Sequence, residues 1–380
     1  MKRISIVVLI LCGCFVSMAW GQQPTCGVYT AWAEFHRRNM QRWNPCEKVL
    51  NVKNVGKLIL KWSFATGNGG QESSPAVSGG IVYIGSYLGT VYALNVNTGA
   101  KLWSVTTGSP VISSPAVANG VVYFGSFDAN VYALNATTGA LSWVYAANSY
   151  VYSSPAVADG VVYVASEDGT VYALNATTGA KLWSYATGGL GVVSSPAVAN
   201  GVVYISSATG GSLYALNAKT GAKLWSYANT RLLLSSPAVA NGVVYVGSED
   251  HRVYALNART GAKLWRYFTG SDVDSSPAVA NGVVYVGSRD HRIYALDAET
   301  GHKLWSFATG SPVISSPAVA NGVVYVGSGI SGNGNVFALN ARTGAKLWSY
   351  ATDALQTSPA VANGVVYVGS DNGVYAFGLK

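Results

Sequence analysis

The sequence is poor in the side chains that carry most acid–base, metal and redox chemistry. Only 11% of its 380 residues are charged, and it contains four cysteines and four histidines. No two cysteines are adjacent, and no Cys-x-x-Cys-His haem-attachment motif is present. The scarcity of charge beside 49% hydrophobic residues excludes a disordered chain. The apolar run Ile4–Leu11 is too short to cross a bilayer and nothing later resembles a transmembrane helix, so no transmembrane span is expected.

The first residues have the pattern of an export signal. Lys2 and Arg3 precede the apolar run, and Ala19-Trp20-Gly21 offers small residues for cleavage. Residues 1–21 are therefore predicted to be a signal peptide, and the mature protein to be periplasmic or secreted. The stretch Leu-Cys-Gly-Cys that ends at Cys14 is an imperfect lipoprotein box, which leaves an outer-membrane lipoprotein as the alternative.

Removal of the signal leaves two cysteines, Cys26 and Cys46. A disulfide between them would close a loop of about twenty residues and contribute roughly 3 kcal/mol, and two unpaired thiols are the alternative. The same region is basic, with seven Lys or Arg against two Glu between Gln22 and Lys61. Nucleic acid is not expected as a partner, because the chain is exported and no base-stacking motif accompanies the charge.

The stretch SSPAVANGVVYVGS occurs three times without change, from Ser235, Ser275 and Ser315. Near copies bring the number of Ser-Pro-Ala-Val units to eight, with successive prolines 40 to 42 residues apart. A period of this length predicts a propeller or a solenoid. Each unit contains an Asn-Gly type of hairpin signal, alternating Val and Tyr, and two further β-type segments. Four short antiparallel strands per repeat predict one blade of a β-propeller.

Counting the strands predicts eight blades in a ring that closes on itself. The first repeat Trp precedes the first Ser-Pro-Ala-Val unit, and the last unit has no Trp after it. This offset is resolved if Lys57–Gly67 forms the outer strand of the blade built from Thr357–Phe377. Each Trp is expected to be a structural wedge between neighbouring blades. The wedges are Trp62, Trp103, Trp143, Trp183, Trp225, Trp265, Trp305 and Trp348.

The chain is accordingly divided into three parts. These are the signal peptide (1–21), an N-terminal extension (22–56) and an all-β, eight-bladed propeller (57–380). Within the extension, Tyr29–Trp43 is expected to form a helical stretch that packs across the propeller. The propeller is expected to be a monomer.

The repeat Ala-Leu-Asn-Ala-x-Thr-Gly-Ala-Lys-Leu-Trp-Ser-Tyr-x-Thr-Gly resembles the tryptophan-docking repeat of the pyrroloquinoline quinone (PQQ)-type propellers. It is most complete at Ala255–Gly270 and Ala295–Gly310, and the resemblance covers Lys57 to Lys380. That superfamily includes quinoprotein alcohol dehydrogenases and the assembly factor BamB, so the resemblance implies the fold but not one function. The quinoproteins stack PQQ between a Trp and a disulfide of adjacent cysteines, hold Ca²⁺ or a lanthanide ion, and use an Asp base.

These parts of a quinoprotein site are missing from the sequence. There is no adjacent cysteine pair, every propeller Trp is assigned to a blade, and the inner strands repeat Ser-Ser-Pro-Ala-Val without an acid, base or metal ligand. No catalytic residue, no metal site and no cofactor is therefore predicted. PQQ and Ca²⁺ belong only to an alternative function.

The repeats differ from one another mainly on one predicted face. The a–b and c–d turns, named for the strands a to d of each blade, are nearly uniform, whereas the b–c loops and the d–a links between blades vary and share the opposite face. Charged residues of blades 5 and 6 form the candidate ligand or partner surface there. It could bind a divalent metal, a partner loop or a sugar, or consist of solvated charges that pair with one another. The candidates are Glu249, Asp250, His251, Arg252, Asp272, Asp274, Arg289, Asp290, His291 and Arg292.

The same face carries apolar or aromatic segments, Ser149–Tyr152 and Arg231–Leu234, which could dock a partner. We therefore predict a non-enzymatic, exported binding or scaffold propeller that presents this face to a protein partner at the cell envelope, in the manner of BamB. A PQQ-dependent alcohol dehydrogenase is the first alternative. A carbohydrate-binding propeller that uses Tyr87, Phe127 and Tyr150 is the second.

Overall fold

The structure is a computed structural model that describes residues 32–33, 35, 41–67, 73–188, 191, 194–208, 210–229, 231, 233–330 and 332–380. The predicted signal peptide lies outside the described residues. Cys46 is disulfide-bonded. Its predicted partner Cys26 also lies outside the described residues, so that pairing stays a prediction. Among the described residues, no helix is long and apolar enough to cross a membrane.

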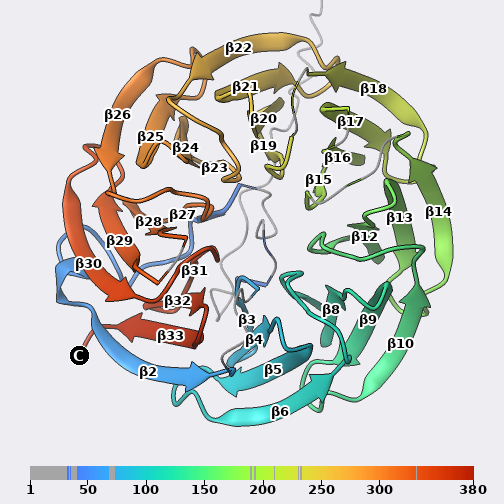
Figure 1. The fold of residues 1–380 in the computed structure, drawn as a ribbon, viewed down its shortest axis with the longest axis horizontal. Helices are drawn as coiled ribbons and strands as arrows, with labels where there is room; N and C mark the ends of the chain where they lie inside the picture. Colours follow the sequence, from blue (N-terminus) through green and yellow to red (C-terminus); the bar gives the residue numbers. More distant parts are fainter. Residues whose placement is uncertain are drawn as a thin grey trace, which may run out of the picture.

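Eight antiparallel sheets stand around a central axis, which confirms the predicted propeller (Figure 1). Within a blade, strand a lies at the axis and strand d at the rim. Strand b is buried almost throughout, as in β20, because it is covered by neighbouring blades on both faces. Strand d alternates between exposed and half-buried positions, as in β22. The core therefore lies between the blades.

The strands repeat with nearly constant bounds. The a strands are β3 (Ala76–Ser78), β7 (Ala116–Ala118), β11 (Ala156–Ala158), β15 (Ala197–Ala199), β19 (Ala238–Ala240), β23 (Ala278–Ala280), β27 (Ala318–Ala320) and β31 (Ala360–Ala362). The b strands are β4 (Ile81–Gly85), β8 (Val121–Gly125), β12 (Val161–Ala165), β16 (Val202–Ser207), β20 (Val243–Ser248), β24 (Val283–Ser288), β28 (Val323–Ser328) and β32 (Val365–Ser370). The c strands are β5 (Thr90–Asn95), β9 (Asn130–Asn135), β13 (Thr170–Asn175), β17 (Ser212–Asn217), β21 (Arg252–Asn257), β25 (Arg292–Asp297), β29 (Gly334–Asn340) and β33 (Gly373–Gly378). The d strands are β6 (Lys101–Thr106), β10 (Leu141–Ala146), β14 (Lys181–Ala186), β18 (Lys223–Ala228), β22 (Lys263–Phe268), β26 (Lys303–Ala308), β30 (Lys346–Thr352) and β2 (Ile59–Ala65).

The ring closes as the strand count predicts. Strand β2, from the start of the propeller, pairs antiparallel with β33 at its end, from Ile59 opposite Gly378 to Ala65 opposite Gly373. The eighth blade thus has the order β2-β33-β32-β31, with its outer strand supplied by the other end of the propeller. Figure 1 shows the blue β2 beside the red β33.

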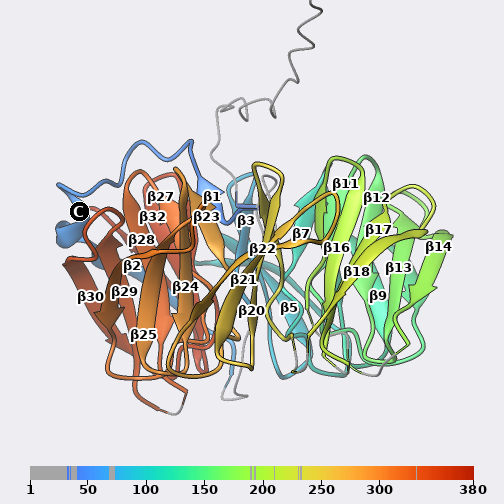
Figure 2. The same cartoon turned by 90° about the horizontal axis from the view of Figure 1, so that it is seen from above.

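The turns separate the two faces of the ring. Every a–b turn has two residues with positive φ, such as Asn241 (49°) and Gly242 (76°), the geometry that an Asn-Gly hairpin turn requires. The a–b turns bond to c–d turns, as in Ala136 N–H to Gly120 C=O, and d–a links bond to b–c loops, as in Val111 N–H to Ser86 C=O. The two predicted turn faces are therefore real, and they lie at the two ends of the ring in side view (Figure 2).

The repeat Trp residues join each blade to the next. In every case the indole Nε1–H donates to a main-chain carbonyl of the following blade, over 2.9 to 3.1 Å. In seven of these contacts a Tyr of strand b donates to the same carbonyl, as Trp103 and Tyr83 both do to Ala136. The indole also lies against the Gly of the next c–d turn, where an added Cβ would come within 2.8 Å of the Trp143 ring at Gly179. Each repeat Trp therefore contacts the blade that follows it, which is the position that a wedge between blades would occupy.

The described part of the N-terminal extension pairs through its main chain with the inner strands of several blades. Trp32 forms an antiparallel bridge with Val77, and Val117 N–H donates to Ala33 C=O. Strand β1 (Trp43–Asn44) pairs in parallel with β27. The helix predicted over Tyr29–Trp43 is therefore wrong for its described residues, because open strand edges at the axis offer main-chain partners that a helix could not use.

The extension leaves the axis on the face of the a–b turns. Gly364 N–H donates to Glu47, and Asn321 Nδ2 donates to Leu50 C=O, both from a–b turns. A short 3-10 helix, η1 (Val55–Lys57), then leads into β2. Figure 2 shows this blue segment along one end of the ring. The extension thus lies on the a–b turns of blades 7 and 8 on its way from the axis to the rim.

Candidate functional site

A cavity of about 220 Å³ lies on the propeller axis, at the end formed by the d–a links. Its innermost tier consists of the second Ser of each Ser-Ser-Pro or Thr-Ser-Pro unit. Each Ser Oγ accepts the main-chain N–H of the equivalent Ser in the preceding blade, over 2.8 to 3.1 Å, and the eighth bond returns to the first. The ring runs through Ser74, Ser114, Ser154, Ser195, Ser236, Ser276, Ser316 and Ser358. The sequence predicts small neutral groups along this channel, but not that their hydroxyls close a ring.

The second tier of the cavity varies from blade to blade. It is formed by the residue two positions before each ring serine, at the end of the d–a link. All of its described members are half-buried. They are Ile112, Tyr152, Leu234, Asp274, Ile314 and Gln356. The cavity therefore combines an invariant polar floor with a wall that has five residue types in its six described members.

Arg42 anchors the extension behind this floor. Its side chain is fully buried, and its guanidinium donates to the carbonyls of Pro317 (2.8 Å) and Pro359 (3.1 Å). The guanidinium also lies 4.6 Å from the ring centroid of Phe35, which lines the cavity. No carboxylate of the described chain pairs with it, so burial lowers the pKa of Arg42 to about 9. The extension thus contributes Phe35 to the cavity lining and holds a buried cation on carbonyls beside it.

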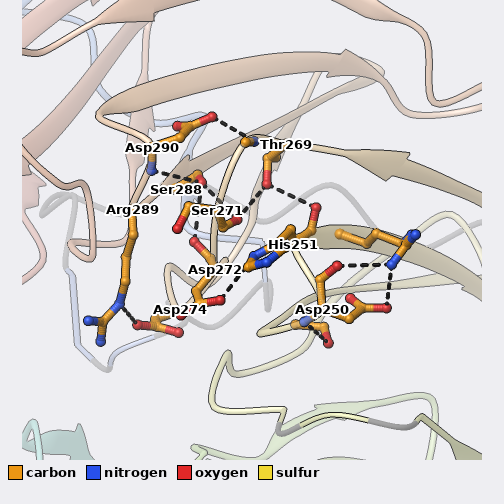
Figure 3. Close-up of polar contacts among 12 residues, drawn as sticks. Asp250, His251, Thr269, Ser271, Asp272, Asp274, Ser288, Arg289 and Asp290 are labelled. Atoms are coloured by element: carbon orange, nitrogen blue, oxygen red, sulfur yellow. Dashed lines mark hydrogen bonds and ion pairs between the residues drawn. The ribbon is translucent and has the colours of Figure 1, made fainter.

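Figure 3 shows part of the predicted charged cluster of blades 5 and 6, including Asp250, His251, Asp272, Asp274, Arg289 and Asp290. The d–a link between the blades contacts both of their b–c loops. Asp272 Oδ1 lies 3.0 Å from His251 Nδ1 in blade 5, and Asp274 Oδ2 lies 2.5 Å from Arg289 Nε in blade 6. The structure therefore brings the three predicted segments together, but as two separate pairs.

Asp250 and Asp290 have a local role within their loops. Tyr254 donates its hydroxyl to Asp250, and Tyr294 donates to Asp290 over 2.5 Å. Asp290 also accepts Gly270 N–H over 2.8 Å. The equivalent residue of blade 2, Asp128, accepts the hydroxyl of Tyr132 in the same way. This repetition identifies the carboxylates as loop acceptors that fix the b–c turn.

His251 and His291 also occupy a special turn position. Their φ angles are 67° and 69°, the left-handed region, and blade 3 has Gly169 at the same position with φ of 87°. Arg252 pairs with Asp250 over 3.2 Å, and its guanidinium lies 5.4 Å from the Phe268 ring centroid. No ion pair joins Glu249, His291 or Arg292 to another described residue.

Asp274 is the one predicted charged residue that lines the cavity. Its side chain is only 12% exposed, and its Oδ1 is buried without a hydrogen-bond partner. Burial raises the pKa of Asp274, and the bond from Arg289 offsets this only in part. Burial, followed by the charges of Asp274 and Asp272, likewise raises the pKa of Glu249. The d–a link therefore carries concentrated negative charge toward the axis.

An aromatic platform leads from the cavity to the surface. Phe127 stacks on Tyr150, with ring centroids 5.3 Å apart and planes 11° apart, and also contacts Tyr152 at 4.3 Å. Tyr150 is 47% exposed, whereas Tyr152 lines the cavity. Tyr87 in the b–c loop of blade 1 is 46% exposed. Two of the three aromatic residues proposed for a sugar site thus stack on each other.

The residues around the cavity do not fit PQQ with a metal ion. Trp62, Trp103, Trp143, Trp183, Trp225, Trp265, Trp305 and Trp348 are all docked on the next blade. The only carboxylate in the described lining, Asp274, already pairs with Arg289. Within the part of the chain that the structure describes, no three His, Cys, Asp or Glu side chains gather as a metal centre needs.

Curated relatives match only short stretches of the chain. The quinoprotein alcohol dehydrogenase PedE of Pseudomonas putida is 45% identical over 69 residues, which are 17% of this chain and 11% of that protein. A quinoprotein ethanol dehydrogenase of Pseudomonas putida is 41% identical over 69 residues, with the same coverage. The chain therefore spans about a tenth of the length of the curated relatives that it matches.

Solved structures share the whole fold at low sequence identity. A europium-containing methanol dehydrogenase superposes with a TM-score of 0.78 at 18% identity and covers 91% of this chain and 90% of its own. BamB from Moraxella catarrhalis superposes with a TM-score of 0.70 at 22% identity, covering 85% of this chain and 100% of its own. The family profile described as outer membrane protein assembly factor BamB matches residues 53–151, 89–227, 188–276 and 250–380. These matches take in the whole propeller, and the chain belongs to that family.

Proposed function

We propose that this protein is a non-enzymatic, exported binding propeller that presents the face of its b–c loops and d–a links to a protein partner in the cell envelope. The observation that carries the proposal is where the repeats differ. One face is built of nearly identical turns, whereas the other combines charged pairs, an aromatic platform and a cavity wall of varied residue types. Uniform turns are typical of a scaffold, whereas loops whose sequences differ from repeat to repeat are typical of a recognition surface.

The family suggests the class of partner. Its description names a factor for outer-membrane protein assembly, so we propose that the partner belongs to that assembly process. Exposed apolar groups on this face, such as Leu88 (54%) and Tyr150 (47%), would supply contact area, and the half-exposed Arg289 would supply charge selection.

A site-specific crosslinking experiment tests this assignment. A photoreactive amino acid is placed at Tyr150 or at Arg289, and at Lys219 in a c–d turn as the matched control on the opposite face. In intact cells, the first two positions are expected to crosslink to the same envelope protein, and Lys219 is expected not to. Crosslinks that are equally strong from Lys219 would contradict the proposal.

The oxidoreductase alternative is tested by titration of the purified protein with PQQ and Ca²⁺. We expect no saturable binding and no dye reduction with simple alcohols, because the described lining offers neither a spare Trp face nor a metal ligand set. Saturable binding with alcohol-dependent turnover would replace the binding-protein assignment.

A further inference from the structure

We propose that the axial cavity binds one sugar ring, either the end of a glycan or a free sugar. The first reason is that the hydroxyl groups of the serine ring have hydrogens without an acceptor. Each ring hydroxyl accepts a main-chain N–H, so its own O–H hydrogen remains to be donated. No acceptor for these hydrogens is found among the described residues, although Ser276, Ser316 and Ser358 are only 3 to 4% exposed. The floor of the cavity is therefore a circle of hydroxyl donors that point to no protein acceptor.

The second reason is a buried acceptor in the wall. Asp274 Oδ1 has no hydrogen-bond partner, while Oδ2 is held by Arg289. A buried carboxylate oxygen gains from a hydroxyl donor and loses when it is left unmet. Gln356 supplies an amide in the same tier. Donors on the floor and acceptors in the wall match the hydroxyl groups of a sugar, each of which both donates and accepts.

The third reason is the apolar part of the wall. Ile112, Leu234 and Ile314 alternate around the axis with the polar members of the tier, and Tyr152 presents an aromatic ring. A pyranose has C–H faces as well as hydroxyls, so it needs both kinds of surface. The stacked pair Phe127–Tyr150 extends the aromatic surface outward from Tyr152 and gives a second ring of a glycan a place to lie.

The size of the cavity limits the ligand. A volume of about 220 Å³ is several times that of a water molecule (~30 Å³) and lies below the ~300–1,000 Å³ of drug-sized pockets. Because Phe35 of the extension lines the cavity and Arg42 is buried beside it, we expect the extension to prevent a chain from threading through the ring. Only a terminal ring can reach the serines.

The proposal is tested by titrating the purified full chain with sugars. Binding is measured by saturation-transfer NMR and by the change in Tyr and Trp fluorescence. The probes are D-glucose, D-galactose and N-acetyl-D-glucosamine, with maltotriose and chitotriose as chains. At least one probe is expected to saturate. A trisaccharide that binds more tightly than its monosaccharide, and loses that advantage in Tyr150→Ala, identifies a glycan end as the natural ligand. Equal affinities identify a free sugar.

Variants locate the site. Asp274→Asn and Tyr152→Ala are each expected to raise Kd about tenfold, since each removes one main contact. Asp159→Asn is the matched control, because Asp159 lies in an a–b turn on the opposite face where six other repeats have Asn. It should leave Kd unchanged. Circular dichroism checks that each variant is folded.

Three results would overturn the proposal. The first is the absence of saturable binding for all five sugars at tens of millimolar. The second is a Kd that neither Asp274→Asn nor Tyr152→Ala alters. The third is preferential binding of inorganic phosphate or citrate, which would mean that the buried Arg42 governs the cavity as an anion site.

Discussion

Replacing Gly179 by Ala should destabilise the propeller much more than replacing Gly160 by Ala. The two glycines lie in the same blade and have nearly the same φ, 72° and 76°. An Ala at Gly160 meets nothing within 4 Å, whereas an Ala at Gly179 places its Cβ 2.8 Å from two ring carbons of Trp143. The pair therefore separates backbone strain from the docking of the indole.

The magnitudes follow from these contacts. A left-handed φ costs an L-residue about 1 kcal/mol, and both variants should show this loss. Forcing a methyl group into a packed contact costs a further ~1–3 kcal/mol, and only Gly179→Ala should show that. The free energy of unfolding is measured by urea denaturation, with an unchanged m value as the check that the unfolding transition is comparable.

The same two glycine substitutions in a Trp143→Ala variant serve as the control. In Trp143→Ala the indole is absent, so the extra loss caused by Gly179→Ala should disappear and the two glycine variants should become equal. If Gly179→Ala and Gly160→Ala are equally destabilising with Trp143 in place, the indole does not pack on the turn as described. The account of blade joining would then be wrong.

Three further results are expected. His291→Gly should raise the free energy of unfolding by about 1 kcal/mol, because glycine adopts a left-handed φ without strain. His251→Gly should raise it less, because this variant also loses the contact with Asp272. Both are compared by their urea midpoints, and equal gains would mean that the contact with Asp272 contributes nothing to stability. Burial raises the pKa of Asp274, so the folded protein takes up a proton at higher pH than the unfolded chain. The free energy of unfolding should therefore rise as the pH falls from neutral toward the ordinary aspartate pKa. Urea midpoints measured across that range should show this rise in the wild type and not in Asp274→Asn. Tyr123→Phe and Trp143→Phe should each lower the free energy of unfolding by about 1 kcal/mol. The double variant should lower it by more than the sum, because the Ala176 carbonyl that accepts both bonds is then left without a donor. Simple additivity would contradict this reasoning.

The fold could be predicted because its signals are local and repeated. Asn-Gly turns, with one Asp-Gly and one Gly-Gly turn, fix the a–b hairpins. The offset between the Trp residues and the Ser-Pro-Ala-Val units requires β2 to pair with β33, as it does. The course of the extension could not be predicted in the same way. Its residues adopt strand because the inner edges at Val77 and β27 offer main-chain partners, and that cause is distant in the sequence.

The candidate site was predicted only in part. Charged residues draw attention as ligands, yet Asp250 and Asp290 turn out to accept hydroxyls from tyrosines within their own blades. The ring serines look unremarkable in sequence because they are identical in every repeat, and their arrangement depends on bonds between blades that no single repeat contains. The signal that could have identified the cavity wall is the position directly before Ser-Ser-Pro or Thr-Ser-Pro, which has seven residue types in eight repeats.

The pairing of β2 with β33 changes how the protein can come apart. A row of repeats with two free ends behaves like a one-dimensional lattice, in which the terminal unit has one neighbour and frays first. Here every blade has two neighbours, so the lattice has a periodic boundary and offers no weak terminal unit. Opening must begin by separating the six pairs of residues that join β2 to β33, or by breaking two blade interfaces at once. A molecule assembled from eight nearly interchangeable parts is therefore expected to unfold as one cooperative body, and to resist proteolysis for as long as that single seam stays closed.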